Sequence, residues 1–497
     1  MSLFAGPQLS PIVRFSDIDP ARIALVVGRH EIDFGRFASD VAEMASWLAG
    51  QGLSVGQTLG ILVNHPYWAW VANLAAMRLG LTSATLTSNF RQEIAAFGEL
   101  DAIVGHVPST ATAKMANRVI PFSVQSLTPL AEQLELTRTS PDRMEPQAES
   151  HAQRLLFTSG TTGKPKAVVW DFEMLHTRVS LVQRSQKVSS ETRLIALLGM
   201  DTTGGFRYPL ATWQAGGCVL FGEPDPESRE TRYARTLFEH SNLLLSSPQR
   251  LETTLSTLHG TWKGKEARTI IVLVGRLPRV LREQAHQIAG CEVSIAYGAT
   301  ETGSIAAGDA SLLDRHSGAV GFAVEGANVQ IVDGNDSPKP RGESGIIRTR
   351  TSYMVHKYEG VEQNDQYGAF RHGWFYPGDH GVIFEDGLLA IEGRGSEIVN
   401  ISGRKFSLTE LETALTKLPE VQDIGAAMLK TDAGDQLNLA VVCSASTDLN
   451  KLSQQIALRL PVITKFRLVR IKTIPRNAMG KIVRNSLTEQ LLRLLQG

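Results

Sequence analysis

Helical and extended patterns of apolar residues alternate along the first third of the chain. Residues 36–50 repeat apolar side chains with the spacing of one helix face, and residues 67–79 are predicted to form the next helix. Short apolar runs at 59–63 and 81–86 are typical of buried strands. This alternation predicts an α/β fold in which helices flank a mostly parallel sheet.

The middle of the chain returns to strand-like runs. They lie at residues 155–157, 167–170, 270–274 and 293–297. Residues 109–150 are polar and weakly periodic, which predicts a surface connection. Residues 333–342 are dense in Gly, Pro, Asp and Asn, so we expect them to join two strands.

The pattern changes after Gly395. Ser407 and Glu410 have the spacing of a capping box, which predicts that a helix begins there. The later segments are strand-like runs at 424–429, 437–443 and 466–474 and a helix at 449–460. Together they make a small α+β unit, so we expect an N-terminal domain of residues 1–394 and a C-terminal domain of residues 395–497.

Length and charge narrow the class of protein. A chain of 497 residues exceeds what one hydrophobic core supports, which also indicates at least two domains. The 50 basic and 50 acidic side chains give no net charge, which argues against a nucleic-acid partner or a polybasic membrane binder. No apolar run approaches the roughly 20 residues of a membrane helix, and no signal-peptide pattern opens the chain. We therefore expect no membrane span and a cytoplasmic location.

The cysteines do not indicate a metal or disulfide site. Cys218, Cys291 and Cys443 lie far apart, and none belongs to a Cys-x-x-Cys pair or a Cys/His cluster. Each is flanked by apolar or strand-like sequence, so we expect three reduced cysteines that pack as small apolar side chains.

The strongest chemical signal is the loop after the strand at 155–157. It combines the hydroxyls of Thr158 and Ser159 and of two more threonines with glycines and lysines. Hydroxyl groups, backbone N–H groups and positive charge are what phosphate oxygens bind. It is not a Walker A loop, because its glycines are too closely spaced and Pro165 follows Lys164. Taken alone, it could equally be a hairpin without a ligand.

Four further motifs follow this loop in order. They are Tyr297-Gly-Ala-Thr-Glu-Thr302, Gly373-Trp-Phe-Tyr-Pro-Gly-Asp379, Glu392-Gly-Arg394 and Pro475-Arg-Asn-Ala-Met-Gly-Lys481. In this order and spacing the set closely resembles the adenylate-forming superfamily of acyl-CoA synthetases, adenylation domains and luciferases. The resemblance covers nearly the whole chain. It implies a large, multi-layered N-terminal domain with parallel-rich sheets and a small, mobile α+β C-terminal domain.

The resemblance also implies a nucleotide site. The residues that would bind the β- and γ-phosphates of ATP are Thr158, Ser159, Gly160, Thr161, Thr162, Gly163 and Lys164. Tyr297 would stack on adenine, and Thr300 would bond the α-phosphate. Glu301 would hold Mg²⁺, which neutralises phosphate charge. Asp379 would accept from the ribose hydroxyls, with Arg394 beside it.

Lys481 is the implied catalytic residue of the small domain. It would reach the α-phosphate and the attacking carboxylate oxygen, where a cation stabilises the charge that develops in the transition state. The small domain would then swing about Gly395 and Ser396 to admit a thiol. Singly, Tyr297 could be a core aromatic, Asp379 a turn residue and Lys481 a surface charge. The set of motifs together favours the functional interpretation.

Two positions bear on the acid substrate. Asp201 lies where many acyl-CoA synthetases have a histidine, and amino-acid-activating relatives use an aspartate near this point to bind the substrate ammonium. Asp201 could pair with an amino group or simply be a turn aspartate. Arg276 replaces a small residue beside the nucleotide and acyl group, where it could pair with a second substrate carboxylate or with an internal Asp or Glu. A bulky arginine there argues against long-chain fatty acids.

The leading hypothesis is an acyl-CoA synthetase for a small, medium-sized or aromatic acid, with ATP, Mg²⁺ and CoA as the other reactants. Gly403 matches the loop that lies along the pantetheine tunnel in relatives, including those that use a carrier protein. The alternatives are an adenylation enzyme that loads a separate carrier protein, an enzyme with an amine acceptor, and a non-catalytic binder that keeps the fold. The presence of Lys481, Glu301 and Asp379 argues against the non-catalytic binder.

Overall fold

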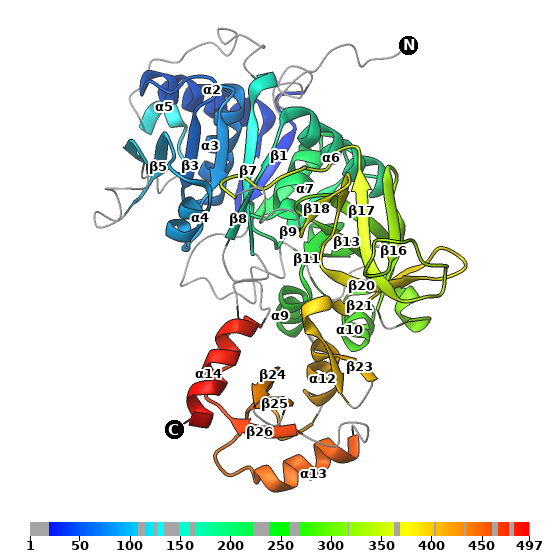
Figure 1. The fold of residues 1–497 in the computed structure, drawn as a ribbon. Helices are drawn as coiled ribbons and strands as arrows, with labels where there is room; N and C mark the ends of the chain where they lie inside the picture. The colour runs from blue at the N-terminus through cyan, green and yellow to red at the C-terminus, as the bar shows by residue number, and fades with distance from the viewer. Residues whose placement is uncertain are drawn as a thin grey trace. The chain divides into compact units, whose positions relative to one another are not determined.

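The computed structural model describes most of the chain. The described residues are 19–107, 116–122, 127–133, 149–159, 165–221, 238–258, 269–273, 275, 277–316, 318–361, 368–401, 404–416, 418–431, 434–459, 466–476 and 482–496. The chain divides into two compact units (Figure 1). The large unit spans residues 1–160, 164–328 and 349–375, and the small unit spans 161–163, 329–348 and 376–497.

The first sheet of the large unit has the strand order β6-β5-β3-β4-β7-β8. Its strands are β3 (Thr58–Leu62), β4 (Thr82–Thr85), β5 (Ala102–Gly105), β6 (Val119–Pro121), β7 (Gln153–Ser159) and β8 (Pro165–Trp170). All neighbours pair in parallel except β7 and β8, which are antiparallel. The prediction of a surface connection at 109–150 was wrong for β6, whose Ile120 is buried against the sheet.

The second sheet runs in the order β15-β14-β13-β12-β11-β9-β10-β1-β2 within the large unit. Its strands are β1 (Ile23–Val27), β2 (His30–Asp33), β9 (Arg193–Ala196), β10 (Cys218–Phe221), β11 (Leu243–Ser246), β12 (Thr269–Val272), β13 (Glu292–Ala299), β14 (Gly303–Asp309) and β15 (Ala319–Ala323). The strands from β13 to β1 are parallel, and both ends of this run continue antiparallel.

Helices form layers on both faces of these sheets. They are α2 (Phe34–Gly50), α3 (Pro66–Arg78), α4 (Phe90–Phe97), α5 (Leu130–Gln133), α6 (Phe172–Ser185), α7 (Thr203–Gln214), α9 (Pro248–Leu258) and α10 (Arg279–Ala289), with 3₁₀ turns η3 (Glu149–His151) and η4 (Ala310–Asp314). Helix α3 packs on β3 and β4, and α7 packs on β9, β10 and β11. Trp70 of α3 stacks on Phe206 of α7 at 5.1 Å and meets Trp213 edge-on, so these helices form a layer between the two sheets.

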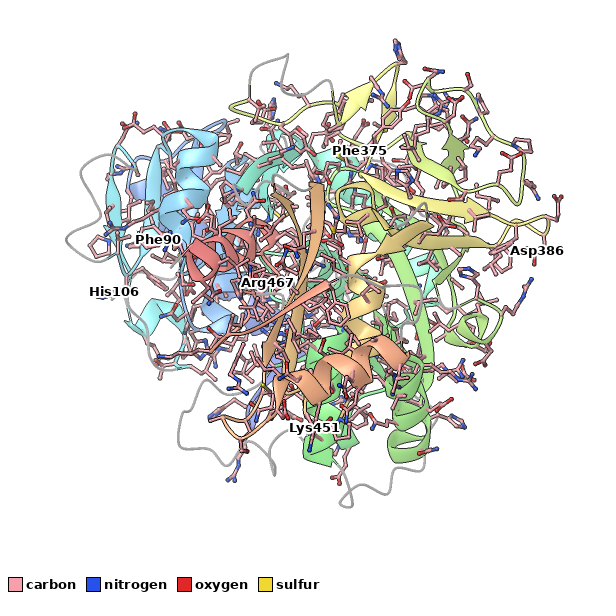
Figure 2. All side chains as sticks on the ribbon, turned by 60° about the horizontal axis from the view of Figure 1, so that its bottom comes forward. Phe90, His106, Phe375, Asp386, Lys451 and Arg467 are labelled. Atoms are coloured by element: carbon pink, nitrogen blue, oxygen red, sulfur yellow. The ribbon has the colours of Figure 1, made fainter. Side chains whose placement is uncertain are left out.

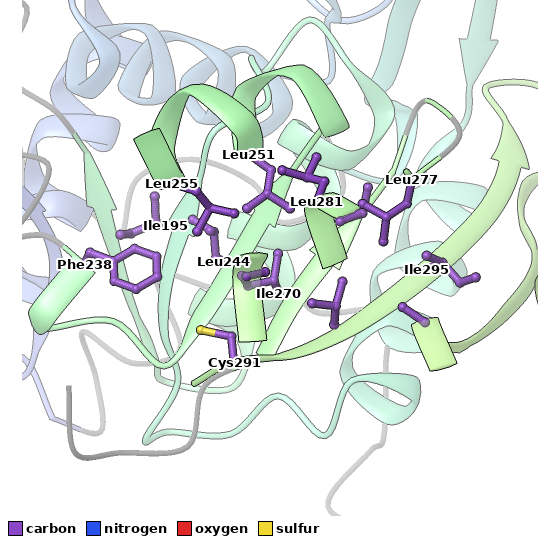
Figure 3. Packing of buried hydrophobic residues seen from close by; sticks show 14 of the residues in the cluster. Ile195, Phe238, Leu244, Leu251, Leu255, Ile270, Leu277, Leu281, Cys291 and Ile295 are labelled. Carbon is purple, nitrogen blue, oxygen red and sulfur yellow. The ribbon is translucent and has the colours of Figure 1, made fainter. Parts of the chain in front are cut away.

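The outer faces of both sheets are covered as well. Phe90 and Ile94 of α4 pack on the first sheet. On the second sheet, Leu251 and Leu255 of α9 and Leu281 of α10 meet apolar side chains of the strands (Figure 3). The prediction of a multi-layered large domain with parallel-rich sheets is therefore confirmed. No helix in the described ranges has the length and apolar character needed to cross a bilayer.

The segment that joins the two units is built from short strands. Strands β16 (Ala327–Val332) and β17 (Gly345–Thr351) are joined by the predicted connection at 333–342, and β18 (Phe370–Arg371) pairs with β19 (Trp374–Phe375). The small unit continues with β20 (Asp379–Ile383), β21 (Leu389–Arg394), the 3₁₀ turn η5 (Gly395–Glu397), and the hairpin of β22 (Ile398–Ile401) and β23 (Arg404–Ser407).

The rest of the small unit is a three-stranded sheet with helices on both faces. Its elements are α12 (Leu408–Leu415), β24 (Asp423–Thr431), β25 (Gly434–Val442), α13 (Leu449–Arg459), β26 (Phe466–Arg470) and α14 (Arg484–Gln496). Strand side chains alternate between two cores, one with α12 and α13 and one with α14. Lys451 on α13 and Arg467 on β26, labelled in Figure 2, are exposed. The α+β prediction is confirmed, with α14 as an additional helix.

The cysteine prediction is correct for two of the three residues. Cys218 and Cys291 are buried in the core of the large unit and carry free thiols. Cys443 is half-buried and accepts a hydrogen bond from Arg470 Nε at 3.4 Å.

A buried ion pair fixes α14 to the small unit. Arg484 binds both carboxylate oxygens of Glu412, with Nη2 2.9 Å from Oε2, and its Nε lies 3.5 Å from Glu397 Oε1. Glu412 also accepts from the backbone N–H of Ala426 at 2.6 Å. Burial raises the pKa of Glu412 despite these partners, so the carboxylate depends on Arg484 for its charge.

Replacing Arg484 with methionine is expected to destabilise the small unit. The change leaves the Glu412 carboxylate buried without a cation, which costs about 3–5 kcal/mol. Differential scanning calorimetry would detect this as a lowered transition temperature. The double variant with Glu412→Gln removes both charges and should be more stable than the single variant. A double variant that unfolds earlier would contradict this account of the pair.

Candidate active site

The phosphate-binding loop predicted from the sequence lies at the end of an antiparallel hairpin. Strand β7 ends at Ser159 and β8 begins at Pro165, with Thr158 paired to Lys166. Thr158 is half-buried. Gly160, Thr161, Thr162, Gly163 and Lys164 lie outside the described residues. The base of this hairpin is therefore fixed by the first sheet of the large unit.

The second predicted motif connects β13 to β14 in the other sheet. Tyr297 is half-buried near the end of β13, and Thr300 and Glu301 form the turn between the strands. A Cβ atom at Gly298 would stand 2.1 Å from the carbonyl oxygen of Gly303, so a larger residue would force the strands apart. Glycine is required here because the two strands approach closely just before the turn.

Arg178 and Trp170 hold this turn from inside the large unit. The guanidinium of Arg178 donates to the carbonyl oxygens of Thr300 at 2.9 Å and Glu301 at 2.8 Å, and also to that of Tyr353. Trp170 Nε1 donates to the same Thr300 oxygen at 3.1 Å, and its ring lies 4.2 Å from the Arg178 guanidinium. Both side chains are fully buried, so the backbone of Thr300 and Glu301 is fixed before any ligand arrives.

Tyr358 joins the hairpin to the turn. Its hydroxyl donates to Glu301 Oε1 at 2.7 Å, and Lys166 Nζ lies 4.4 Å from its ring centre. The backbone N–H of the next residue, Glu359, donates to the carbonyl of Ala167 at 2.9 Å. Two motifs more than a hundred residues apart are thus brought together on one unit. The arrangement places a carboxylate next to the base of the predicted phosphate-binding loop.

The surroundings of Glu301 fit a magnesium ion. Oε1 accepts from Tyr358, while Oε2 has no hydrogen-bond partner within the described part of the chain. The carboxylate is a hard oxygen ligand, and Mg²⁺ in nucleotide sites is commonly held by one or two carboxylates, phosphate oxygens and water. No group of three or more His, Cys, Asp or Glu side chains gathers elsewhere among the described residues. Glu301 could therefore hold Mg²⁺ together with a bound triphosphate.

Asp379 and Arg394 meet in the small unit. They lie opposite each other where β20 pairs with β21, and Arg394 Nε is 3.3 Å from Asp379 Oδ1. Asp379 is 7% exposed and follows Gly378, whose φ of +81° favours glycine. The Gly395 N–H donates to the Gly378 carbonyl at 2.8 Å, which ties the predicted hinge residue to the same turn.

Lys481 lies outside the described residues, which end at Arg476 and resume at Ile482. Arg476 pairs with Ile482 in an antiparallel bridge, and the Val483 N–H donates to the Pro475 carbonyl at 2.8 Å. Arg476 Nη2 also lies 2.6 Å from Asp423 Oδ1 at the start of β24. The described residues on the two sides of 477–481 therefore contact each other, and Arg476 also contacts the small sheet.

Among the substrate residues predicted from the sequence, the structure describes Asp201 alone, because Arg276 and Gly403 lie outside its described ranges. Asp201 is half-buried just before α7, where Thr202 is the N-cap and accepts from the Gly205 N–H at 3.0 Å. Its negative charge acts on the buried Arg154, whose pKa burial lowers to about 9. Arg154 donates to the Met200 carbonyl at 2.9 Å, so it fixes the loop that contains Asp201.

The buried arginines were not predicted from the sequence. Arg178 lies on the apolar face of α6 with Leu175, Val179 and Val182, and Arg154 interrupts the apolar strand β7. The sequence did contain a signal for them, because each arginine occupies a position where the pattern expects an apolar side chain. Both residues fix backbone in the candidate site.

The fold, together with the β7–β8 hairpin and the β13–β14 turn that Tyr358 joins, defines an adenylate-forming enzyme. The AMP-binding enzyme family matches residues 14–359, well over half of the chain. The Probable CoA ligase CCL9 of Humulus lupulus is 24% identical over 506 residues, covering 96% of this chain and 94% of that protein. The chain therefore belongs to the AMP-binding enzyme family, and it is an enzyme of the acid–thiol ligase class.

Solved structures share the fold along nearly the whole chain. ATP-bound MatB from Rhodopseudomonas palustris superposes with a TM-score of 0.81 at 22% identity, covering 98% of this chain and 99% of that one. O-succinylbenzoate Coenzyme A Synthetase (MenE) from Bacillus subtilis, in complex with ATP and magnesium ion, gives 0.82 at 20% identity, covering 97% and 99%. At these identities the comparison establishes the fold.

Replacing Arg178 with lysine is expected to weaken ATP binding about tenfold, because a compact ammonium cannot span the separate carbonyls that the three guanidinium nitrogens reach. Titration of the variant with ATP would measure this. Arg184→Lys on the same helix is the control, since Arg184 is exposed and should leave the affinity unchanged. Equal affinities for both variants would mean that the turn does not need Arg178.

Proposed function

We propose that this protein uses ATP and Mg²⁺ to convert a carboxylic acid to an acyl-adenylate and then transfers the acyl group to the thiol of CoA. The observation that carries this proposal is the bond from Tyr358 to Glu301. It joins the β13–β14 turn, which carries the Glu301 carboxylate, to the base of the predicted phosphate-binding hairpin. The acid is a small, medium-sized or aromatic one.

In the first step, a carboxylate oxygen of the acid attacks the α-phosphorus of ATP. The bond between the α-phosphorus and its bridging oxygen breaks, and pyrophosphate leaves. Thr158 and the loop after it would bind the departing phosphates, and Thr300 would donate to the α-phosphate. Lys481 would neutralise charge on the attacking and phosphoryl oxygens. Magnesium held at Glu301 would supply charge neutralisation of the phosphates.

The nucleoside would be held by the remaining motif residues. Tyr297 would stack on adenine, and Asp379 would accept hydrogen bonds from the ribose hydroxyls. The contact with Arg394 at 3.3 Å supports this role, because it orients one carboxylate oxygen of Asp379.

In the second step, the CoA thiol attacks the acyl carbonyl carbon. The bond from that carbon to the AMP oxygen breaks, AMP leaves, and the thiol proton is released. Gly403 would lie along the pantetheine arm. Rotation of the small domain about Gly395 and Ser396 would remove Lys481 and admit the thiol.

Pyrophosphate release tests this function directly. Purified protein is incubated with Mg²⁺-ATP and a panel of fatty acids of graded length, benzoates, cinnamates, dicarboxylates and amino acids, with and without CoA. We expect release that depends on one class of acid and rises to full turnover with CoA. Acid-dependent release that CoA does not change would identify a carrier protein or an amine as the acceptor. Absence of release with every acid would contradict adenylation.

A further inference from the structure

A second buried arginine, Arg207, lies on α7 without a counter-ion. It is 4% exposed, and its Nε donates to the carbonyl of Thr203 on its own helix at 3.2 Å. Across the described residues, its two Nη atoms have no hydrogen-bond partner and no carboxylate within ion-pair distance. A guanidinium stays protonated in proteins, so a largely buried side chain carries a positive charge here with its Nη donors unused. These Nη atoms are not among the fully enclosed ones, so a ligand can reach them.

The neighbours of Arg207 do not neutralise it. Burial lowers the pKa of Arg178, and the nearby positive charge of Arg207 lowers it further. All three nitrogens of Arg178 bind neutral carbonyl oxygens, so this arginine adds positive charge to the region. The ionisable groups that favour the charge of Arg207 are the phenols of Tyr208 and Tyr353. Burial raises the pKa of both, so neither phenol is an anion at neutral pH.

Arg154 provides a contrast within the same unit. It is equally buried, but its Nη atoms donate to Asn73 at 2.5 Å and to Thr85 at 2.7 Å, and the charge of Asp201 supports it. The protein thus supplies partners for one buried arginine and leaves the donors of another unused. A buried cation without a partner is strongly destabilising, and a ligand anion would remove that cost.

The position of Arg207 indicates the source of the anion. It lies one turn into α7, shortly after Asp201, which is predicted to lie near the acid. Arg178, its neighbour, holds the turn of Thr300 and Glu301. The reacting carboxylate is not the expected partner, because Lys481 is the cation assigned to it. The phosphates are expected at the β7–β8 hairpin.

We propose that Arg207 binds a second, non-reacting carboxylate of the acid substrate, so that the protein activates a dicarboxylic acid. This rests on the proposed function, since it names the acid that adenylation consumes. Arg207 is thus a specificity-determining residue: its Nη atoms would bind the distal carboxylate bidentately.

Matched pairs of acids test the proposal. Pyrophosphate release is measured with butyrate against succinate, hexanoate against adipate, and benzoate against terephthalate. The wild-type kcat/KM for at least one diacid should exceed that for its monoacid by roughly 10- to 100-fold. In Arg207→Met the preference should disappear through a raised KM for the diacid, while monoacid turnover is retained or improves. Arg207→Lys keeps the charge and should retain part of the preference, and the exposed Arg184→Met is the control.

A binding measurement separates this inference from the proposed function. Thermal unfolding of each variant is followed with and without the same diacids. If diacids stabilise the wild type but not Arg207→Met, the anion site at Arg207 is supported. That conclusion would hold even if no pyrophosphate were released. Absence of pyrophosphate release would contradict adenylation but not the anion site. The Arg207 proposal would be overturned if the wild type favoured the monoacid in every pair. It would also be overturned if Arg207→Met and Arg207→Lys lost monoacid and diacid turnover equally. Adenylation itself would stand in either case.

Discussion

Replacing Lys481 with alanine is expected to lower the rate of acyl-adenylate formation about 100- to 1,000-fold while changing ATP affinity only a few-fold. The ammonium is needed where charge develops during attack on the α-phosphorus, and removing one such group typically costs this much. The nucleotide would still be held by the hairpin, the β13–β14 turn and Asp379. Acid-dependent exchange of labelled pyrophosphate into ATP measures the first step by itself.

Lys472→Ala is the matched control for Lys481→Ala. Lys472 is an exposed lysine of the same small unit, and its loss should leave the exchange rate unchanged. Transfer from preformed acyl-adenylate to CoA should also survive in Lys481→Ala, because Lys481 would leave the site before that step. Exchange at a near wild-type rate in Lys481→Ala would show that the assigned mechanism is wrong.

Replacing Glu301 with glutamine is expected to lower kcat about 100-fold and to weaken the dependence of the reaction on Mg²⁺. The amide can still accept the hydrogen bond from Tyr358, so the turn keeps its shape. What is lost is the negative charge that a hard cation requires. Initial rates over a range of Mg²⁺ concentrations would show a raised half-saturation point and partial recovery at high Mg²⁺.

Tyr358→Phe distinguishes the effect of the negative charge of Glu301 from the effect of the hydrogen bond that orients its carboxylate. The variant removes the 2.7 Å bond and keeps the carboxylate. We expect a loss of about tenfold, smaller than for Glu301→Gln, since a hydrogen bond to a charged group contributes about 1.5 kcal/mol or more and the negative charge itself remains. If Glu301→Gln kept the wild-type response to Mg²⁺, the metal would have to be held elsewhere.

The large-scale fold could be predicted because the sequence patterns are strong. The helix at 36–50 buries Phe37, Val41 and Leu48, and the turn formers at 333–342 join β16 to β17. The capping box at Ser407 correctly marks the start of α12. Strand β6 was missed because three residues are too few to establish a period of two.

The buried arginines could not be placed from local sequence because their partners are distant. Arg178 binds carbonyls 122 and 175 positions away along the chain, and only the fold brings them together. Tyr358 reaches Glu301 across 57 positions in the same way. Motifs predict which residues carry the chemistry of the site, but residues that orient backbone through tertiary contacts have no spacing rule that reveals them.

The described residues on the two sides of 477–481 are tied to the core of the small unit. Arg476 pairs with Ile482, and its guanidinium binds Asp423 at the start of β24. Substitutions within 477–481 should therefore leave the cores around β24 and α14 intact, so the small unit can serve as a constant frame for variants that differ only in these five residues.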